Sequence, residues 1–165
     1  LTEETFRSYR DEGGVVIIHM MKPEWIEMGI QAPHTMVASD GMPYAPGAHP
    51  RSAGTFSRFL GRYVRDDGAL SLMDGLRKVT LMPAQRLETT SPQMKRKGRI
   101  QIGSDADVTI FDPARIIDTA TFEDDLSFSI GVEFVLVNGT FVVRDGENVD
   151  GACPGVPIVG RRIVF

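Results

Sequence analysis

The stretch that decides the fold runs from Thr35 to Gly41 and reads TMVASDG. Its apolar first half, Thr35–Ala38, predicts a strand buried on both faces, as strands of parallel sheets are. This strand runs directly into the polar turn Ser39-Asp40-Gly41. Because barrels and open α/β sheets build their active sites at the carboxyl ends of parallel strands, Asp40 is the first candidate functional residue.

A second apolar run lies upstream. Val15-Val16-Ile17-Ile18-His19-Met20 is rich in β-branched residues and predicts another strand buried on both sides. Residues Pro23–Met28 between the two strands predict one or two helical turns. Further upstream, residues 2–12 predict a short amphipathic helix that Gly13-Gly14 closes.

The residues after Asp40 predict a long loop. Residues 41–54 contain three prolines and three glycines, and long loops in compact domains are usually functional or disordered. Helix signals follow the loop: a stripe of Phe56, Phe59, Leu60 and Tyr63, a cap at Ser71 with Asp74 three residues on, and Pro83 in a first turn.

From Lys95 onward the pattern changes to short strands. Asp107–Phe111 is one, and Val132–Val137 is another. Asn138-Gly139 then leads into Thr140–Val143, and Asn-Gly between apolar strands is the strongest short hairpin signal. The sequence therefore predicts an α/β part over residues 1–94 and a mostly β part over residues 95–165.

Composition limits the functional classes. Acidic residues number 22 and basic residues 18, a net charge of −4, so nothing recruits nucleic acid or an anionic membrane. No stretch approaches the ~20 apolar residues that span a bilayer. Cys153 is the only cysteine and cannot form an internal disulfide; we interpret it as a small residue in a terminal turn. A reducing, cytoplasmic compartment is therefore expected.

Three side chains near the predicted strand end are candidates for chemistry. An ionised Asp40 would need a metal, a cation or several donors, although aspartate after a strand is also an ordinary turn former. Arg51 presents a rigid fork suited to a substrate carboxylate. His49 could orient a neighbour, ligate a metal or bridge loop backbone. From the residues alone, a purely loop-pinning role for His49 and Arg51 stays open.

The other basic residues near the predicted strands are less informative. His19 ends the first predicted strand, where it either lines an active-site mouth or is a hydrogen-bonded core residue. His34 precedes the Asp40 strand and is interpreted as structural. Lys22 is interpreted as a solvated lysine. No two of the three histidines form a pair on one strand or helix.

An ordered set of motifs resembles the D-aminoacylases, a branch of the amidohydrolase superfamily. The motifs are Ser39-Asp40-Gly41, His49-Pro50-Arg51, Gly54-Thr55-Phe56, Leu60-Gly61-Arg62-Tyr63, Leu76–Thr80 with Pro83–Leu87, Lys97–Ile100 with Gly103, Ala106-Asp107, Phe111-Asp112 and Val135–Gly139. Each motif alone is modest, but their order and spacing cover roughly residues 13–155.

The resemblance implies an α/β fold: the last βα units of a TIM-like (β/α)8 amidohydrolase barrel, residues 1–94, plus a small β-sandwich domain, residues 95–165. It implies the C-terminal fragment of a zinc-dependent hydrolase that cleaves the amide bond of N-acyl-D-amino acids. In this family a zinc-bound hydroxide attacks the acyl carbonyl. Asp40 matches the aspartate that transfers the proton, and it is a candidate second-metal ligand. Arg51 matches the arginine that binds the substrate's α-carboxylate, with His49 as a further substrate-binding candidate.

The departures from the family pattern are equally informative. The family's early His-x-His strand, its metal-binding cysteine and its later histidine ligands have no counterpart in this chain. Because catalytic zinc needs three or four ligands, we expect the chain alone to be inactive and to need an N-terminal barrel segment as its partner. A partial barrel exposes strand edges, so we also expect a homo-oligomer or marginal stability.

Two other functions stay open. One is a different amidohydrolase, similar to dihydroorotase or hydantoinase, although the His49-Pro50-Arg51 loop weighs against it. The other is a catalytically inactive barrel remnant that acts as a binding or assembly module. The absent metal ligands favour the remnant, while Asp40 and Arg51 weigh against it.

Overall fold

The computed structural model describes residues 2–13, 17–42 and 47–160. The helices, in chain order, are α1 (Glu3–Glu12), α2 (Pro23–Gln31), α3 (Arg51–Arg58), the π-helix η1 (Phe59–Asp66), α4 (Leu72–Val79), α5 (Leu81–Leu87) and the 3-10 helix η2 (Pro92–Arg96). The strands are β1 (Val108–Phe111), β2 (Val132–Val137), β3 (Thr140–Arg144) and β4 (Glu147–Asn148). No helix among these described residues is long and apolar enough to cross a membrane.

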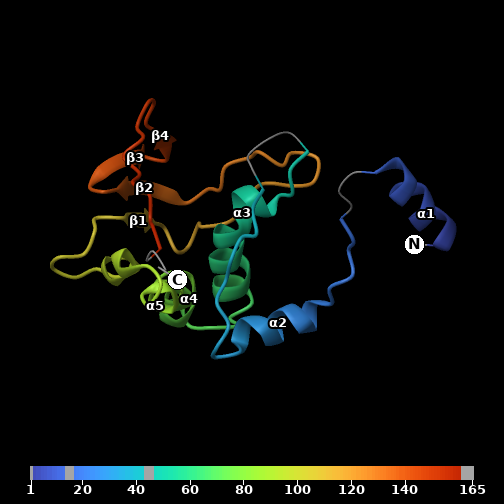
Figure 1. Cartoon of the computed structure of the whole chain (residues 1–165), viewed down its shortest axis with the longest axis horizontal. Helices are drawn as coiled ribbons and strands as arrows, with labels where there is room; N and C mark the ends of the chain where they lie inside the picture. The colour runs from blue at the N-terminus through green and yellow to red at the C-terminus, as the bar shows by residue number, and fades with distance from the viewer. Residues whose placement is uncertain (1, 14–16, 43–46, 161–165) are drawn as a thin grey trace, which may run out of the picture.

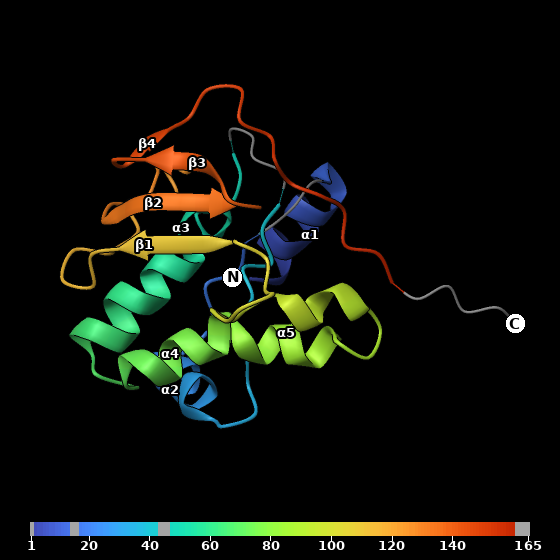
Figure 2. The same cartoon turned by 90° about the vertical axis from the view of Figure 1, so that its left-hand side faces the viewer.

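The four strands form one antiparallel sheet in the order β1-β2-β3-β4, with α3, α4 and α5 on one side of it (Figure 2). Asn138 and Gly139 join β2 to β3 with φ values of 48° and 76°, the left-handed backbone that a type I′ turn requires. The predicted hairpin is therefore confirmed, as is the predicted strand at β1. This sheet is what the described residues contribute to the predicted small β-sandwich.

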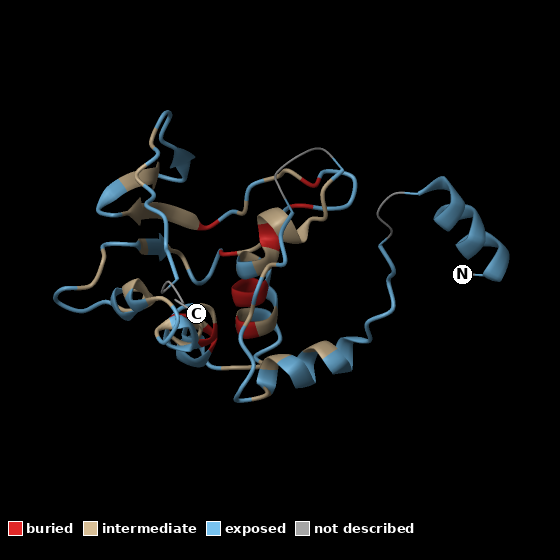
Figure 3. Cartoon of the chain, in the orientation of Figure 1, coloured by how far each residue is buried: buried red, intermediate tan, exposed pale blue. Residues whose placement is uncertain are grey.

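The core lies along the continuous helix formed by α3 and η1 (Figure 3). Phe59, Leu60 and Val64 on η1 are buried and pack with Ile116, which is 3% exposed. The predicted apolar stripe is thus confirmed at its centre. Phe56 at its start lies in α3 and is 45% exposed, so it is not part of this core.

The local helix signals hold elsewhere. Ser71 caps α4, where its Oγ accepts a hydrogen bond of 3.1 Å from the Asp74 amide. Pro83 lies in the first turn of α5, and Gly13 ends α1 with φ 75°. The expectation of a loop through residue 54 is wrong, because α3 already begins at Arg51. Pro50 precedes it in helical backbone, and proline at a helix start loses no hydrogen bond.

The predicted parallel strands do not form among the described residues. Residues 17–20 and 35–40 have no strand partner, and Ile18 and Met20 are 56% and 67% exposed. Val15 and Val16 of the first prediction lie outside the described residues. A parallel strand needs neighbours to pair its backbone groups, and the sheet that forms is antiparallel and starts at residue 108. The intervening helix α2 is longer than predicted, and α1 stands apart from the rest of the chain (Figure 1).

One buried lysine fastens the segment that leads to Asp40. Lys78 on α4 is 5% exposed, and its Nζ donates to the carbonyl oxygens of Ala32 at 2.5 Å and Thr35 at 3.0 Å. The amide of Val37 in turn donates to the Lys78 carbonyl at 3.4 Å. The extended segment before Asp40 is therefore held by α4 and not by a sheet.

Candidate active site

Asp40 and Arg51, which the sequence assigns to one site, are in contact. An Arg51 Nη2 lies 2.9 Å from the Asp40 Oδ2, and the Arg51 Nε donates to the Asp40 carbonyl at 2.9 Å. Asp40 has φ 48°, which turns the chain sharply between the extended segment and the loop. Its carboxylate is 85% exposed, whereas the Arg51 side chain is 38% exposed.

The loop around Asp40 is tied to the first turn of α3. The amide of Met42 donates to the Ser52 Oγ at 3.1 Å, and the amide of Gly41 donates to the Ser39 Oγ at 3.2 Å. These contacts hold Asp40 beside Arg51 although no strand ends there. The prediction that Asp40 follows a buried strand is wrong for the described structure, while its catalytic role stays a prediction.

His49 is linked to Arg51 through the backbone. The Arg51 amide donates to the His49 Nδ1 at 3.0 Å. An accepting Nδ1 carries no proton, so the imidazole in this geometry is neutral with its proton on Nε2. Burial, the positive charge of Arg51 and the proximity of His19 all lower the pKa of His49, which favours the same neutral form.

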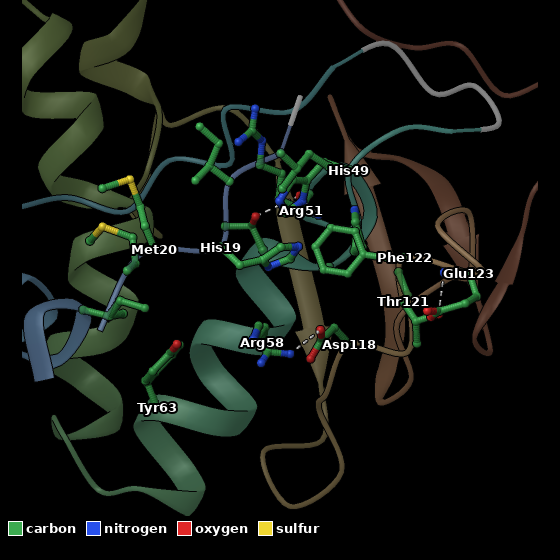
Figure 4. Close-up of a pocket in the computed structure, with 18 residues that line it drawn as sticks. His19, Met20, His49, Arg51, Arg58, Tyr63, Asp118, Thr121, Phe122 and Glu123 are labelled. Atoms are coloured by element: carbon green, nitrogen blue, oxygen red, sulfur yellow. Dashed lines mark hydrogen bonds and ion pairs between the residues drawn. The ribbon is translucent and has the colours of Figure 1, made fainter. Parts of the chain in front are cut away.

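A cavity of about 630 Å³ lies beside these residues (Figure 4). His49 and Arg51 line it, together with an apolar wall that includes Ile17, Ile18 and Met20. Asp40 is not among the described residues that line it, so the structure brings Arg51 and His49 into the cavity wall and leaves Asp40 behind Arg51.

A second arginine, Arg58, lines the cavity about two helical turns after Arg51. Arg58 Nη1 donates to the Asp118 Oδ2 at 3.1 Å, and the Asp118 side chain is 9% exposed. Burial alone would lower the pKa of Arg58, but the hydrogen bond and charge of Asp118 outweigh it and raise that pKa. Arg58 is therefore a permanent positive charge whose nearest ion-pair partner is fixed.

The remaining candidates from the sequence lie in different places. The ring of His19 lies 4.9 Å from that of Phe122 and lines the cavity; because His19 is exposed, the alternative of a core histidine is wrong. His34 is exposed in the turn after α2. Lys22 is exposed, with its Nζ 5.2 Å from the Trp25 ring centre, and Cys153 is exposed as well.

The described residues do not by themselves fit a metal ion. Within residues 2–13, 17–42 and 47–160, no group of three or more His, Cys, Asp or Glu side chains could hold one. His19 and His49 both flank Phe122, but neither has a carboxylate or thiol beside it that completes a ligand set. A zinc site would need ligands from outside this set of residues.

Among the cavity residues that sequence reasoning missed are Arg58, Asp118 and Phe122. Asp118 and Phe122 belong to the connector, residues 112–131, which joins β1 to β2. The contact of Asp118 with Arg58 on α3 spans sixty residues of chain.

Comparison with known proteins shows which family and which relatives the chain is similar to. The profile of the "Amidohydrolase family" matches residues 23–143. An N-acyl-D-aspartate deacylase of Alcaligenes xylosoxydans xylosoxydans is 40% identical over 123 residues, which are 74% of this chain and 24% of that protein. A D-aminoacylase of the same organism is 40% identical over 111 residues, 67% of this chain and 22% of that protein.

Solved structures agree with these relatives. A crystal structure of a D-aminoacylase superposes with a TM-score of 0.76 at 35% identity and covers 87% of this chain and 28% of its own. An N-acyl-D-glutamate deacylase from Bordetella bronchiseptica, complexed with zinc and a phosphonate inhibitor, superposes with a TM-score of 0.68 at 36% identity, over 78% of this chain and 27% of its own. The chain spans about a quarter of the length of the relatives it matches.

Proposed function

Because the chain belongs to the amidohydrolase family, in its D-aminoacylase branch, we propose that it is the C-terminal part of an enzyme that hydrolyses the amide bond of N-acyl-D-amino acids. The observation that carries this proposal is the placement of Arg51. Its guanidinium lines a cavity and is already bound to a carboxylate, that of Asp40. An N-acyl-D-amino acid offers a carboxylate of the same kind.

Substrate binding is proposed as an exchange of partners at Arg51. In the structure, the Nε and Nη2 groups of Arg51 are used by the carbonyl and the carboxylate of Asp40. The α-carboxylate of the substrate takes the fork of Arg51, since two parallel hydrogen bonds to a carboxylate are the strongest that a guanidinium makes. Asp40 is thereby released to act as a base.

The chemical step is proposed to use Asp40 for proton transfer. Water attacks the acyl carbon, Asp40 accepts a proton from that water, and the proton passes to the amide nitrogen as the C–N bond breaks. The products are a carboxylate and a free D-amino acid. The Asp40 carboxylate is exposed, and its one ion pair among the described residues is with Arg51.

His49 is proposed to bind substrate as a neutral donor. Its Nδ1 is occupied by the Arg51 amide, which leaves the Nε2 proton for an oxygen of the substrate. The lowered pKa of His49 keeps the imidazole from competing with Arg51 as a second cation.

The metal and the rest of the fold are proposals for the whole protein. One related structure contains zinc, and another is named for a binuclear metal centre. We infer that the whole protein binds zinc. In this chain, Asp40 is the candidate ligand, for a second metal ion. We propose residues 1–94 as the barrel end and residues 95–165 as the small β domain. The exposed Ile18, Met20 and Met36 suit burial against the N-terminal barrel segment or, without it, a second copy of this chain.

The first experiment measures zinc content and hydrolysis of N-acetyl-D-amino acids for this chain and for the complete protein. Zinc and turnover in the complete protein alone support the proposal. Turnover of cyclic ureides in place of N-acyl-D-amino acids would indicate a dihydroorotase- or hydantoinase-like enzyme. A complete protein with neither zinc nor turnover would be the inactive remnant. We also propose that the protein works in the cytoplasm, which suits the exposed thiol of Cys153.

Two variants of the complete protein test the residues. Asp40→Asn should lower kcat by about 100-fold or more, the usual range for loss of a general base. Arg51→Lys should lower kcat/KM by about 30-fold or more for N-acyl-D-amino acids, since a bidentate charge pair is lost, and should barely affect the matching acyl amine that lacks a carboxylate. Arg7→Lys, on the exposed face of α1, is the matched control. Equal losses on both substrates would overturn the role of Arg51.

A further inference from the structure

The connector crosses α3 and η1 at a distance that only glycine permits. A Cβ added at Gly61 would lie 2.2 Å from the Ile116 carbonyl oxygen. A Cβ added at Gly54 would lie 2.6 Å from the Asp118 Cβ. Real side chains do not tolerate such distances, so the path of the connector is set by these two glycines.

Two arginines fasten the connector to the same helix. The Arg65 Nη1 donates to the Ile116 carbonyl at 2.6 Å, and the Arg58 Nη1 donates to the Asp118 Oδ2 at 3.1 Å. Because the Asp118 carboxylate is nearly buried, its pairing with Arg58 is screened less than a surface ion pair. The connector is therefore fixed to the helix immediately before it reaches the cavity.

A tight turn then presents Phe122 to the cavity. The Thr121 Oγ1 accepts hydrogen bonds from the amides of Glu123 at 3.2 Å and Asp124 at 3.0 Å, and the Thr121 amide donates to the Asp124 carbonyl at 2.9 Å. These bonds define the backbone on both sides of Phe122. The ring of Phe122 points at His19 and His49 (Figure 4).

Phe122 meets both histidines edge to face. Its ring centre lies 5.1 Å from that of His49 at an interplanar angle of 68°, and 4.9 Å from that of His19 at 77°. These are the favourable geometries for aromatic pairs. Because Phe122 is 51% exposed, it is not part of the core, and within the described part of the chain its ring packs against His19 and His49.

His49 in turn caps the helix that carries Arg51. The residue before α3 is Pro50, which provides no side-chain hydrogen bond to the free amides of the first turn. The His49 Nδ1 accepts the hydrogen bond of the Arg51 amide and replaces the missing cap. A half-turn of the imidazole would put a carbon in that place and break the bond, so the ring orientation of His49 decides whether α3 is capped.

We propose that Phe122 is a positioning residue: it holds the His49 ring in the orientation that caps α3 and so fixes the start of the helix from which Arg51 reaches the cavity. The inference rests on the proposed function and deepens it, because it gives the small β domain a part in binding the substrate carboxylate. Phe122 acts through His49 and Arg51 and does not react itself.

Kinetics of the complete protein provide the first test. Phe122→Leu keeps an apolar side chain but removes the ring, and it should raise KM for an N-acetyl-D-amino acid about 3- to 10-fold, the value of one aromatic pair, with kcat within about twofold. Phe122→Tyr keeps the ring and should restore KM. Phe6→Leu on α1 is the matched control, since Phe6 is 50% exposed, and should leave both constants unchanged.

The imidazole itself provides a test that needs no turnover. With ¹⁵N-histidine in the complete protein, His49 should show a single tautomer with an unprotonated Nδ1. Phe122→Leu should convert this to an average of two tautomers, and Phe122→Tyr should keep the single one. Thr121→Val removes the hydroxyl that holds the turn, so it should also give an average of two His49 tautomers. It replaces Phe122→Leu in this test if Phe122→Leu does not fold.

The outcomes separate the two proposals. Turnover with an unchanged KM in Phe122→Leu would overturn the positioning role and leave the function intact. Absence of turnover in the unaltered complete protein would overturn the function, and the His49 tautomer would then decide the positioning role by itself. Equal falls in kcat for the Leu and Tyr variants would overturn the positioning role, because they would indicate general disruption.

Discussion

The β2–β3 hairpin and the open segment, residues 17–40, are both rich in apolar residues, but only the hairpin forms a sheet. In the hairpin, Val137 pairs with Thr140 across a two-residue turn. In the open segment, two predicted strands flank α2 and neither pairs within the described residues. The hairpin thus contains its own partner, while the open segment depends on partners elsewhere.

The difference follows from the geometry of the two kinds of sheet. Antiparallel strands can be joined by as few as two residues, as β2 and β3 are, so the loss of chain entropy on pairing is small. Parallel strands need a long crossover, and the sheets that they form are buried on both faces. The described residues offer no such neighbours, so the open segment is held instead by contacts such as those of Lys78.

The largest effect on stability is expected in the packed part of the chain, where η1 contacts the connector. Gly61→Ala places a Cβ 2.2 Å from the Ile116 carbonyl oxygen and should lower the free energy of unfolding by about 3 kcal/mol. A Cβ added at Gly29 in α2 meets nothing within 4 Å. Gly29→Ala should therefore raise the free energy of unfolding by less than about 1 kcal/mol. Urea unfolding followed by circular dichroism measures both. Similar losses for the two variants would contradict the comparison.

The next effect concerns what holds the open segment. Lys78→Met removes hydrogen bonds to the carbonyls of Ala32 and Thr35 and should cost about 1–3 kcal/mol, the penalty for unpaired buried acceptors. Amide exchange of residues 32–40 should accelerate more than that of the hairpin. Lys95→Met, at an exposed lysine, is the control. Uniform acceleration across both regions would show that Lys78 is not a local anchor.

A smaller effect is expected at the turn of the hairpin. Gly139 has φ 76°, so Gly139→Ala should cost about 1–2 kcal/mol, the penalty for a side chain in left-handed backbone. Gly155→Ala is the control, since Gly155 is not in the left-handed region and a Cβ there meets nothing. Thermal unfolding of the two variants measures this cost. An unchanged stability of Gly139→Ala would mean that the turn does not direct the hairpin.

The smallest effect is a dependence on pH next to the hairpin. Burial raises the pKa of Asp107, but hydrogen bonds from Lys97 and the Asn138 amide outweigh it, so the pKa lies below its usual 3.8. A lowered carboxyl pKa gives stability that is present above about pH 4 and lost as pH falls through the folded value. Asp107→Asn should therefore reduce stability at neutral pH and flatten its decline in acid, as unfolding at a series of pH values will show.

Sequence reasoning reached those parts of the site that are close along the chain. Asp40 and Arg51 are separated by eleven residues, and His49 by two from Arg51, so one loop brings them together. Arg58 and Asp118 are sixty residues apart, and no local sequence pattern predicts their contact. The connector that brings Phe122 to His49 was missed for the same reason.

By itself, the sequence determined the caps, the apolar stripe of η1 and the hairpin, because each depends on residues within a few positions of one another. It also determined the family resemblance, which rests on ordered motifs. Only the tertiary structure decided that Asp40 pairs with Arg51 outside any sheet and that the connector reaches the cavity. These contacts depend on packing between distant segments, where a close approach such as that at Gly61 selects one path of the chain among many.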